Sequence, residues 1–123
     1  VAPRPHVKTA KNLDVAALLH EGARPCPVTV STPAEAEAFA EGGYTDITYA
    51  VGIGPHELPR VLAKLRRGVT PRVLLDGTEQ AESVAEASRW AGLAVPARIE
   101  IDCDGHRGGP RPDTPGLPGI GRV

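Results

Sequence analysis

The chain has 123 residues, of which 41% are hydrophobic and 24% charged, and its formal net charge is −1 at pH 7. This length suffices for one domain with a hydrophobic core, whereas the near-neutral charge, without a basic block, does not favour nucleic acid as a partner. No apolar run approaches the length of a membrane span and no signal-peptide pattern opens the chain. We therefore expect a cytoplasmic protein that does not bind membranes, in which Cys26 and Cys103 are free, partly buried thiols.

Segments with the patterns of strands and helices alternate along the chain. Short runs rich in β-branched or other apolar residues predict strands at residues 4–8, 27–31, 46–51, 72–75 and 97–102. Helical spacing, with a glycine after each segment, predicts helices at residues 13–20, 34–41, 56–67 and 79–91. Strands at intervals of roughly twenty to twenty-six residues, each followed by a helix or its beginning, indicate right-handed βαβ units and a parallel sheet.

The predicted helices carry more detailed expectations. Thr32-Pro33-Ala34-Glu35 has the form of a capping box with proline at the first helical position, and Thr78 is expected to cap the last helix. The first helix is expected to turn three apolar residues toward the sheet, namely Val15, Leu18 and Leu19.

Five βα units could form a small doubly wound sheet or the first part of a (β/α)8 barrel of the TIM type. A doubly wound sheet would carry a glycine-rich phosphate turn or an acidic cluster after its first strand, whereas this chain has Lys8-Thr9-Ala10-Lys11 there. We therefore predict an α/β fold, a partial barrel of about five units over residues 1–109, followed by a Pro/Gly-rich loop over residues 110–123. Because the chain opens on Val1, almost at a strand, and stops where a helix would begin, we interpret it as part of a longer protein.

Lys8 lies near the carboxyl end of the first predicted strand, which is the end where the loops of a barrel carry its chemistry. A lysine held there, partly out of water, could lose its proton and form a Schiff base, and the alternative is an ordinary surface lysine beside a helix. Other polar residues at predicted strand ends should share this face of the sheet: Thr9, Ser31, Thr32, Asp76, Thr78, Asp104, His106 and Arg107.

The loop after the fifth predicted strand contains His106 and Arg107 between glycines. These glycines allow a tight turn that can bring the guanidinium group inward. Because arginine stays charged, Arg107 would serve near a cofactor as a fixed hydrogen-bond donor rather than as an acid.

Together these two motifs resemble those of a known enzyme group. The chain resembles the pyridoxal-phosphate (PLP) enzymes of the D-threonine aldolase and D-serine dehydratase group, within the alanine racemase N-terminal-domain superfamily, which has the fold type III barrel. Arg4-Pro5-His6-Val7-Lys8-Thr9 is similar to the group's opening motif, and residues 102–109 are similar to its fifth-strand motif. The resemblance covers about residues 2–113, and Ala10 stands where many members have histidine.

The resemblance implies a set of roles. Lys8 would hold PLP as a Schiff base and act in catalysis, while Arg107 and His106 would contact the cofactor. The implied reaction is that of a lyase on β-hydroxy D-amino acids, in which the cofactor draws electrons from the α-carbon and the released Lys8 amine serves as a base. The family also implies a homodimer when the protein is full length, with any zinc or other divalent metal bound outside this chain. We expect the isolated chain to have little or no turnover, since a partial barrel leaves open edges.

Other functions stay open at this point. A non-catalytic PLP-binding or homeostasis protein and an amino-acid racemase of the same superfamily would share these motifs, and an α/β interaction module without a cofactor would share the fold. The residues that separate aldolase, dehydratase, deaminase and racemase would lie outside this chain.

Overall fold

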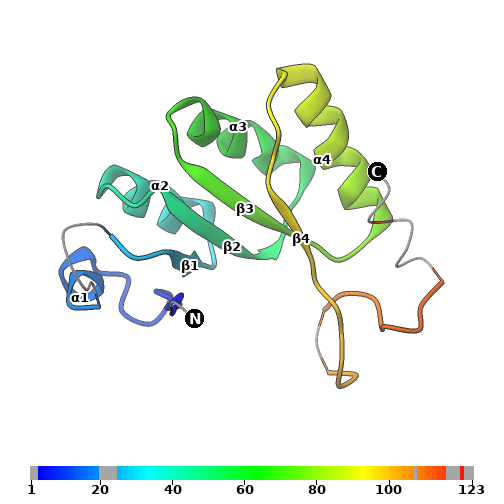
Figure 1. Cartoon of the computed structure of the whole chain (residues 1–123), viewed down its shortest axis with the longest axis horizontal. Helices are drawn as coiled ribbons and strands as arrows, with labels where there is room; N and C mark the ends of the chain where they lie inside the picture. The colour runs from blue at the N-terminus through cyan, green and yellow to red at the C-terminus, as the bar shows by residue number, and fades with distance from the viewer. Residues whose placement is uncertain (1–2, 20–24, 107, 116–119, 121–123) are drawn as a thin grey trace.

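The structure is a computed structural model that describes residues 3–19, 25–106, 108–115 and 120. Figure 1 shows its elements, which appear in chain order. They are α1 (Leu13–Ala17), β1 (Val28–Val30), α2 (Pro33–Glu41), β2 (Asp46–Gly52), the 3-10 helix η1 (Pro55–Glu57), α3 (Leu58–Arg66), β3 (Thr70–Leu75), α4 (Thr78–Ala91) and β4 (Ala97–Ile99). Within the described residues, no helix has the length and apolar character needed to cross a membrane.

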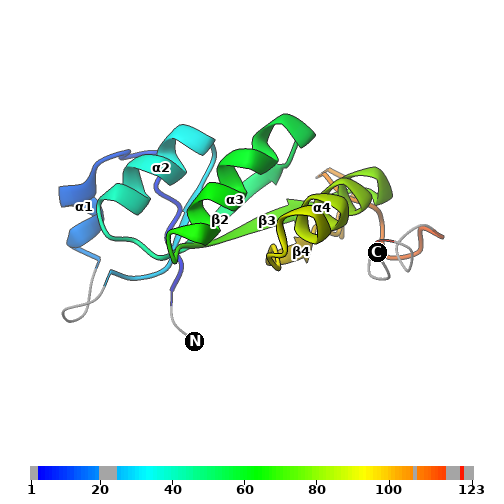
Figure 2. The same ribbon diagram turned by 90° about the horizontal axis from the view of Figure 1, so that it is seen from above.

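The four named strands form one parallel sheet in the order β1-β2-β3-β4. Each strand lies beside its predecessor, so the order lacks the reversal that defines a doubly wound sheet. Right-handed crossovers in such an order place every connecting helix on one face of the sheet. Figures 1 and 2 show α2, α3 and α4 lying along one side of the sheet. This is how consecutive units of a (β/α)8 barrel are arranged, and it confirms the predicted fold class.

The first predicted strand, residues 4–8, is reduced to one parallel bridge between His6 and Thr29. The backbone N–H of Thr29 donates to the Pro5 carbonyl at 2.8 Å, and the N–H of Val7 donates to the Thr29 carbonyl at 2.9 Å. Pro5 has no N–H to extend this ladder, and the chain turns directly after Val7. The segment therefore lies where the sequence placed it, beside β1, but the prediction of a full strand was wrong.

The hydrophobic core lies between the sheet and its helices. In β3 the buried residues Pro71, Val73 and Leu75 alternate with partly exposed ones, as side chains do on the two faces of a strand. The sequence placed the start of this strand two residues later, although Pro71 lies inside it. The large side chains that are most completely buried are Ile47, Val28, Val30 and Val73.

The helix α1 does not turn its apolar residues toward the sheet, which corrects the sequence prediction. It ends at Ala17, so Leu18 and Leu19 lie beyond it with 83% and 52% of their surface exposed, and Val15 is 46% exposed. Ala16 is the residue that α1 buries, while Leu13 packs against Gly42 at the end of α2. The helix is thus anchored beside α2 rather than laid across the sheet.

Two predicted helix caps have different outcomes. The Thr32 hydroxyl caps α2 by accepting the backbone N–H of Glu35 at 3.1 Å, as predicted. The Glu35 carboxylate accepts the N–H of Ser31 at 2.8 Å, one residue before the position that a standard capping box would use. The N-cap of α4 is Gly77, which has no side chain to donate or accept, so the prediction of Thr78 as the cap was wrong.

At the carboxyl-terminal end of the chain, β4 is shorter than the predicted strand and stops at Ile99. Of the predicted Pro/Gly-rich loop, the structure describes residues 110–115 and Ile120. Ile120 is buried and lines a hollow beside α4 together with Ala81 and Val84.

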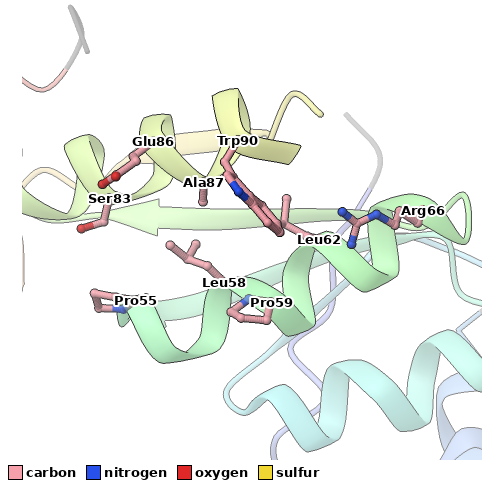
Figure 3. A pocket seen from close by; sticks show the side chains of 9 residues that line it. All are labelled: Pro55, Leu58, Pro59, Leu62, Arg66, Ser83, Glu86, Ala87 and Trp90. Carbon is pink, nitrogen blue, oxygen red and sulfur yellow. The ribbon is translucent and has the colours of Figure 1, made fainter. Parts of the chain in front are cut away.

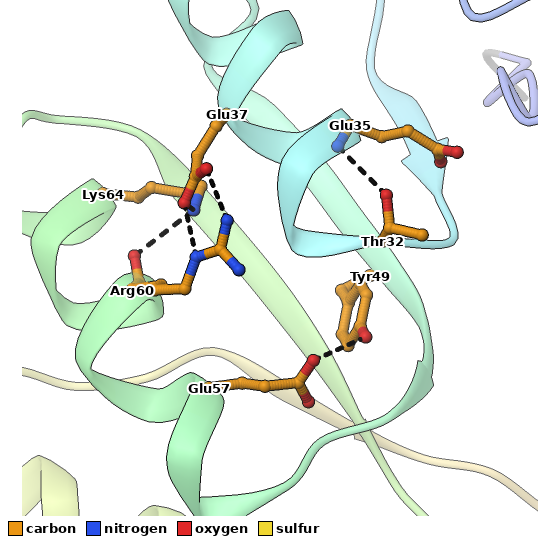
Figure 4. A network of polar contacts seen from close by, with 7 residues as sticks. All are labelled: Thr32, Glu35, Glu37, Tyr49, Glu57, Arg60 and Lys64. Atoms are coloured by element: carbon orange, nitrogen blue, oxygen red, sulfur yellow. Dashed lines mark hydrogen bonds and ion pairs between the residues drawn. The ribbon is translucent and has the colours of Figure 1, made fainter.

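An ion-pair network joins α2 to α3 (Figure 4). The Glu37 carboxylate accepts two hydrogen bonds from the Arg60 guanidinium, at 2.7 and 2.5 Å, and lies 3.3 Å from the Lys64 ammonium. The hydrogen bond from Arg60, aided by the charge of Lys64, lowers the pKa of Glu37 to about 2. Because this carboxylate is bound in its charged form, the network should stabilise the fold only while Glu37 is ionised.

We therefore predict that Glu37→Gln lowers stability at pH 7 by about 0.5–1 kcal/mol, the usual value for an exposed pair. A carboxylate with a lowered pKa contributes fully above its unfolded pKa of about 4.5 and loses that contribution as the pH falls toward about 2. Urea midpoints should thus differ between wild type and variant at pH 7 and converge near pH 2. Glu41→Gln, at an exposed position of the same helix, should show neither effect. A difference in urea midpoint between wild type and Glu37→Gln that stays constant with pH would contradict the conclusion that ionised Glu37 stabilises the fold.

Candidate functional site

The segment that carries Lys8 is fixed at its start by Arg4. The Arg4 guanidinium donates to the Asp46 carboxylate at 2.9 Å and to the carbonyl of Val28 at 3.3 Å. Arg72 of β3 is paired with the same carboxylate. The hydrogen bond from Arg4 is the main reason why the pKa of Asp46 is lowered. Asp46 thereby connects the lysine segment to both β2 and β3.

Lys8 itself lies on a tight turn of residues 7–11, here named the lysine turn. The backbone N–H of Lys11 closes it by donating to the Val7 carbonyl at 2.8 Å. Val7 is buried and holds the turn on the core, whereas Lys8, Thr9 and Ala10 are exposed. The turn thus presents the Lys8 side chain to solvent from a backbone that is anchored beneath it, so within this chain Lys8 is not withdrawn from water as the sequence analysis had considered.

His6 lies against this turn. Its Nδ1 accepts the backbone N–H of Lys8 at 3.2 Å, and its Nε2 lies 3.5 Å from the Ser31 hydroxyl. Partial burial, followed by the charge of Lys8, lowers the pKa of His6. A lowered pKa favours the neutral imidazole, which is the form that can accept a hydrogen bond at Nδ1.

The chain has three lysines, and their environments differ. Lys11 forms an ion pair with Glu35 at 3.1 Å, and Lys64 is buried with its ammonium 3.3 Å from Glu37. Within the described part of the chain, no hydrogen bond or ion pair involves the Lys8 ammonium group. Lys8 is therefore the lysine whose amine is accessible and uncommitted, which a group that must attack a carbonyl carbon requires.

Glu35 is the buried acidic group of this region, with 8% of its surface exposed. Burial acts to raise its pKa, but the hydrogen bond from the Ser31 N–H and the ion pair with Lys11 outweigh that effect, so the pKa of Glu35 is lowered. Nearby, the Tyr49 hydroxyl donates to Glu57 at 3.0 Å (Figure 4). Burial and this hydrogen bond raise the pKa of Tyr49 to about 12, which keeps the phenol protonated.

The loop after β4 is held by its aspartates and glycines. Asp102 is buried and accepts the backbone N–H of Gly105 at 2.9 Å, while its own N–H donates to the Pro110 carbonyl at 3.0 Å. Gly105 and Gly109 both have positive φ, at 77° and 92°, a conformation that glycine adopts readily. His106 is exposed on this loop, and Arg107 lies outside the described residues.

Because the sheet is parallel, the predicted site residues follow its strands at one common edge. The Lys8 backbone and the Ser31 hydroxyl both contact His6 beside β1, whereas the loop that carries His106 follows β4 at the far end of the strand order (Figure 1). Within the described residues, no hydrogen bond joins Lys8 to His106.

Cys26 and Cys103 are free as expected, although Cys103 is exposed rather than partly buried. The described part of the chain holds no cluster of three His, Cys, Asp or Glu side chains that could bind a metal.

A groove of about 480 Å³ lies between α3 and α4, as Figure 3 shows. Leu58, Leu62 and Ala87 line it, and Trp90 stands beside it with 82% of its surface exposed. None of the strand-end residues that the sequence singled out lines this groove, so we place the candidate site at the strand ends.

Two residues of this region were not predicted as part of a site. Asp46 was assigned only to a strand and Glu35 only to a capping box, because both act through partners that are distant in the sequence. The nearest signal was the position of Glu35 three residues after a helix cap, where a carboxylate can reach back toward the preceding strand.

Comparison with known proteins identifies the family. The family described as "Alanine racemase, N-terminal domain" matches residues 1–116. The chain belongs to this family. The resemblance inferred from the two motifs is therefore confirmed at the level of the superfamily.

Individual proteins of known activity and known structure are also similar to the chain. The chain is 47% identical over 121 residues to D-threo-3-hydroxyaspartate dehydratase from Delftia sp. (strain HT23), with 98% of this chain and 32% of that protein covered. A solved structure of the Delftia enzyme aligns with a TM-score of 0.92 over 99% of this chain and 32% of that chain. The 3-hydroxy-D-aspartate aldolase of Paracoccus denitrificans is 29% identical over 107 residues, with 86% and 28% covered. The structure of D-threonine aldolase from Filomicrobium marinum aligns with a TM-score of 0.75 at 28% identity, covering 94% and 31%.

These relatives are a dehydratase and aldolases, hence lyases, in agreement with the enzyme class that the resemblance implied. The chain spans about a third of the length of the relatives that it matches.

The geometry of the β4 loop predicts different effects for two adjacent glycines. Gly109 has positive φ, and a Cβ there would overlap the Glu100 carbonyl oxygen, so Gly109→Ala should strain the loop by about 1–2 kcal/mol or more. A Cβ at Gly108 would meet only the end of the Glu100 side chain, at 3.3 Å, so Gly108→Ala should be tolerated. Hydrogen exchange of the Asp102 and Gly105 amides measures how well the loop is held, and it should be faster in Gly109→Ala than in Gly108→Ala. Equal protection of these amides in the two variants would contradict the predicted difference.

Proposed function

We propose that this chain is the N-terminal part of a PLP-dependent lyase that acts on β-hydroxy D-amino acids, with Lys8 as the cofactor lysine. The observation that carries the proposal is the environment of Lys8, an uncommitted lysine at the carboxyl edge of a parallel sheet of the alanine racemase family. The relatives named as 3-hydroxyaspartate dehydratase and aldolase act on amino acids with a β-hydroxyl group, which supports this substrate class.

The residues present fit the cofactor at its aldehyde end. Schiff-base formation requires an accessible and unprotonated amine. The exposed Lys8 side chain provides the access and forms no ion pair within the described residues. PLP, when bound, withdraws electrons from the α-carbon of an amino acid. The neutral His6 imidazole beside the turn adds no positive charge that would repel a protonated substrate amine.

In this proposal Lys8 has two tasks. Its amine would hold the aldehyde of the cofactor, and when free it would serve as a base on the side of the substrate that it faces. The proton that it would take is the α-proton in dehydration and the β-hydroxyl proton in aldol cleavage. The proposal covers both outcomes known by name among the relatives. Dehydration would lose the β-hydroxyl as water, and hydrolysis of the resulting imine would give ammonia and an oxo acid. Aldol cleavage would break the Cα–Cβ bond and give glycine and an aldehyde.

The remaining parts of the site belong to the same proposal. His106 and Arg107 would contact the cofactor from the loop beyond β4, once further units close the barrel and bring this loop across from Lys8. A divalent metal or zinc would bind outside this chain. We further propose a cytoplasmic homodimer; the free state of both cysteines supports the reducing compartment.

Lys8→Arg in the full-length protein tests the central assignment. The guanidinium group keeps the charge but cannot form a Schiff base, so borohydride reduction with PLP should label wild type at Lys8 and leave the variant unlabelled there. Activity on D-threo-3-hydroxyaspartate, D-threonine and D-serine should fall by a factor on the order of 10²–10⁴. Peptide mass spectrometry locates the label, and ammonia and aldehyde assays identify the reaction.

Lys64→Arg is the matched control, because that lysine is buried and paired and should not contribute to labelling or turnover. Unchanged turnover in Lys8→Arg would overturn the proposal. Labelling of wild type at Lys8 without cleavage of any of the three substrates would retain the cofactor site and overturn the lyase assignment, as expected for a PLP-homeostasis protein.

We expect residues 1–123 alone to show no measurable cleavage under conditions in which the full-length protein turns over. Among the described residues, β4 pairs only with β3, and the Lys8 segment pairs only with β1, so both ends of the sheet lack a neighbour. Assaying both proteins at equal concentration with added PLP tests this. Clear cleavage by a purified monomer of residues 1–123 would contradict it.

A further inference from the structure

We propose that Glu35 is a positioning residue for Lys8, acting through Lys11 and Ser31 to fix the lysine turn. This inference rests on the proposed function, since it concerns the placement of the amine that would hold the cofactor. Glu35 belongs to α2 and is far from the lysine turn in sequence, yet it contacts the end of that turn and the residue that follows β1.

The first contact holds the backbone of the turn. Lys11 has φ 47°, the only positive φ among the described non-glycine residues, and its N–H closes the turn on Val7. A side chain disfavours this left-handed conformation, so other contacts must keep the residue there. The ion pair between the Lys11 ammonium and Glu35, at 3.1 Å, is such a contact.

The second contact reaches Lys8 from the other side. Glu35 accepts the backbone N–H of Ser31, and the Ser31 hydroxyl lies 3.5 Å from Nε2 of His6. The other ring nitrogen of His6 accepts the N–H of Lys8. One carboxylate is thus connected to both ends of the segment that carries Lys8.

Glu35 is itself held rigidly enough for this role. It is buried in the first turn of α2, its N–H is bound by the Thr32 cap, and a carboxylate is favoured at a helix N-terminus. Lys8, by contrast, has no ion pair of its own within the described residues, so its position is set by the turn beneath it. Small displacements of a reacting group can reduce rates by large factors.

The experiment uses the full-length protein and measures the rate of borohydride-trapped labelling at Lys8 at limiting PLP, together with the thermal midpoint. Glu35→Gln removes the charge with little change in shape. Lys11→Gln removes the charge that makes the ion pair while keeping a side chain that disfavours the positive φ. Both should slow labelling about tenfold or more, and the double variant should be no slower than the slower single variant.

Two controls separate positioning from general stability. Lys11→Arg keeps the ion pair and should label within about twofold of wild type. Glu37→Gln removes a paired carboxylate from the same helix but faces α3, so it should lower the thermal midpoint without slowing labelling.

The outcomes are distinguishable from failure of the proposed function. If wild type is not labelled at Lys8, the proposed function fails and this inference fails with it. If wild type is labelled and both Glu35→Gln and Lys11→Gln label at the wild-type rate, the inference alone is overturned. It is also overturned if labelling in every variant, Glu37→Gln included, follows the thermal midpoint.

Discussion

Two backbone hydrogen bonds to Thr29 are the constraint on which the rest of the site depends. They place the segment before Lys8 in parallel register with β1, although Pro5 prevents a longer ladder. A pairing this short needs support at both ends. Arg4 supplies it at the start through Asp46, and Glu35 supplies it after the turn through Lys11. Asp46 belongs to β2 and Glu35 to α2, so the position of Lys8 depends on how these two elements pack against the segment that precedes β1.

Much of this organisation could be predicted from local patterns. Glycines mark the helix ends, and Gly68 and Gly92 adopt the positive φ that such positions favour. Alternating strand and helix segments predicted a parallel sheet, and a parallel sheet by itself aligns the carboxyl ends of its strands. The placement of Lys8 at that edge therefore followed from order along the chain, without knowledge of any contact.

Some errors arise because the deciding partner is not local, and others arise from the local backbone. Leu18 and Leu19 have helical spacing, but α1 ends before them and packs beside α2. Thr78 has the right chemistry for a cap, yet the backbone makes Gly77 the N-cap. Asp46 and Glu35 bind groups that are remote in sequence, and periodicity carries no information about such pairs. The role of Arg107 stays a prediction, since it lies outside the described residues.

The scarcity of lysine in this chain has a chemical consequence. Arginines outnumber lysines eleven to three, and two of the three lysines hold their ammonium groups in ion pairs. Guanidinium groups do not condense with aldehydes as amines do, because they remain protonated and delocalised. A surface built in this way offers few competing amines to a reactive carbonyl compound, so encounters elsewhere on the chain are unproductive. The selectivity of Lys8 for an aldehyde would then arise partly from the scarcity of other lysine amines on the chain, in addition to any binding pocket.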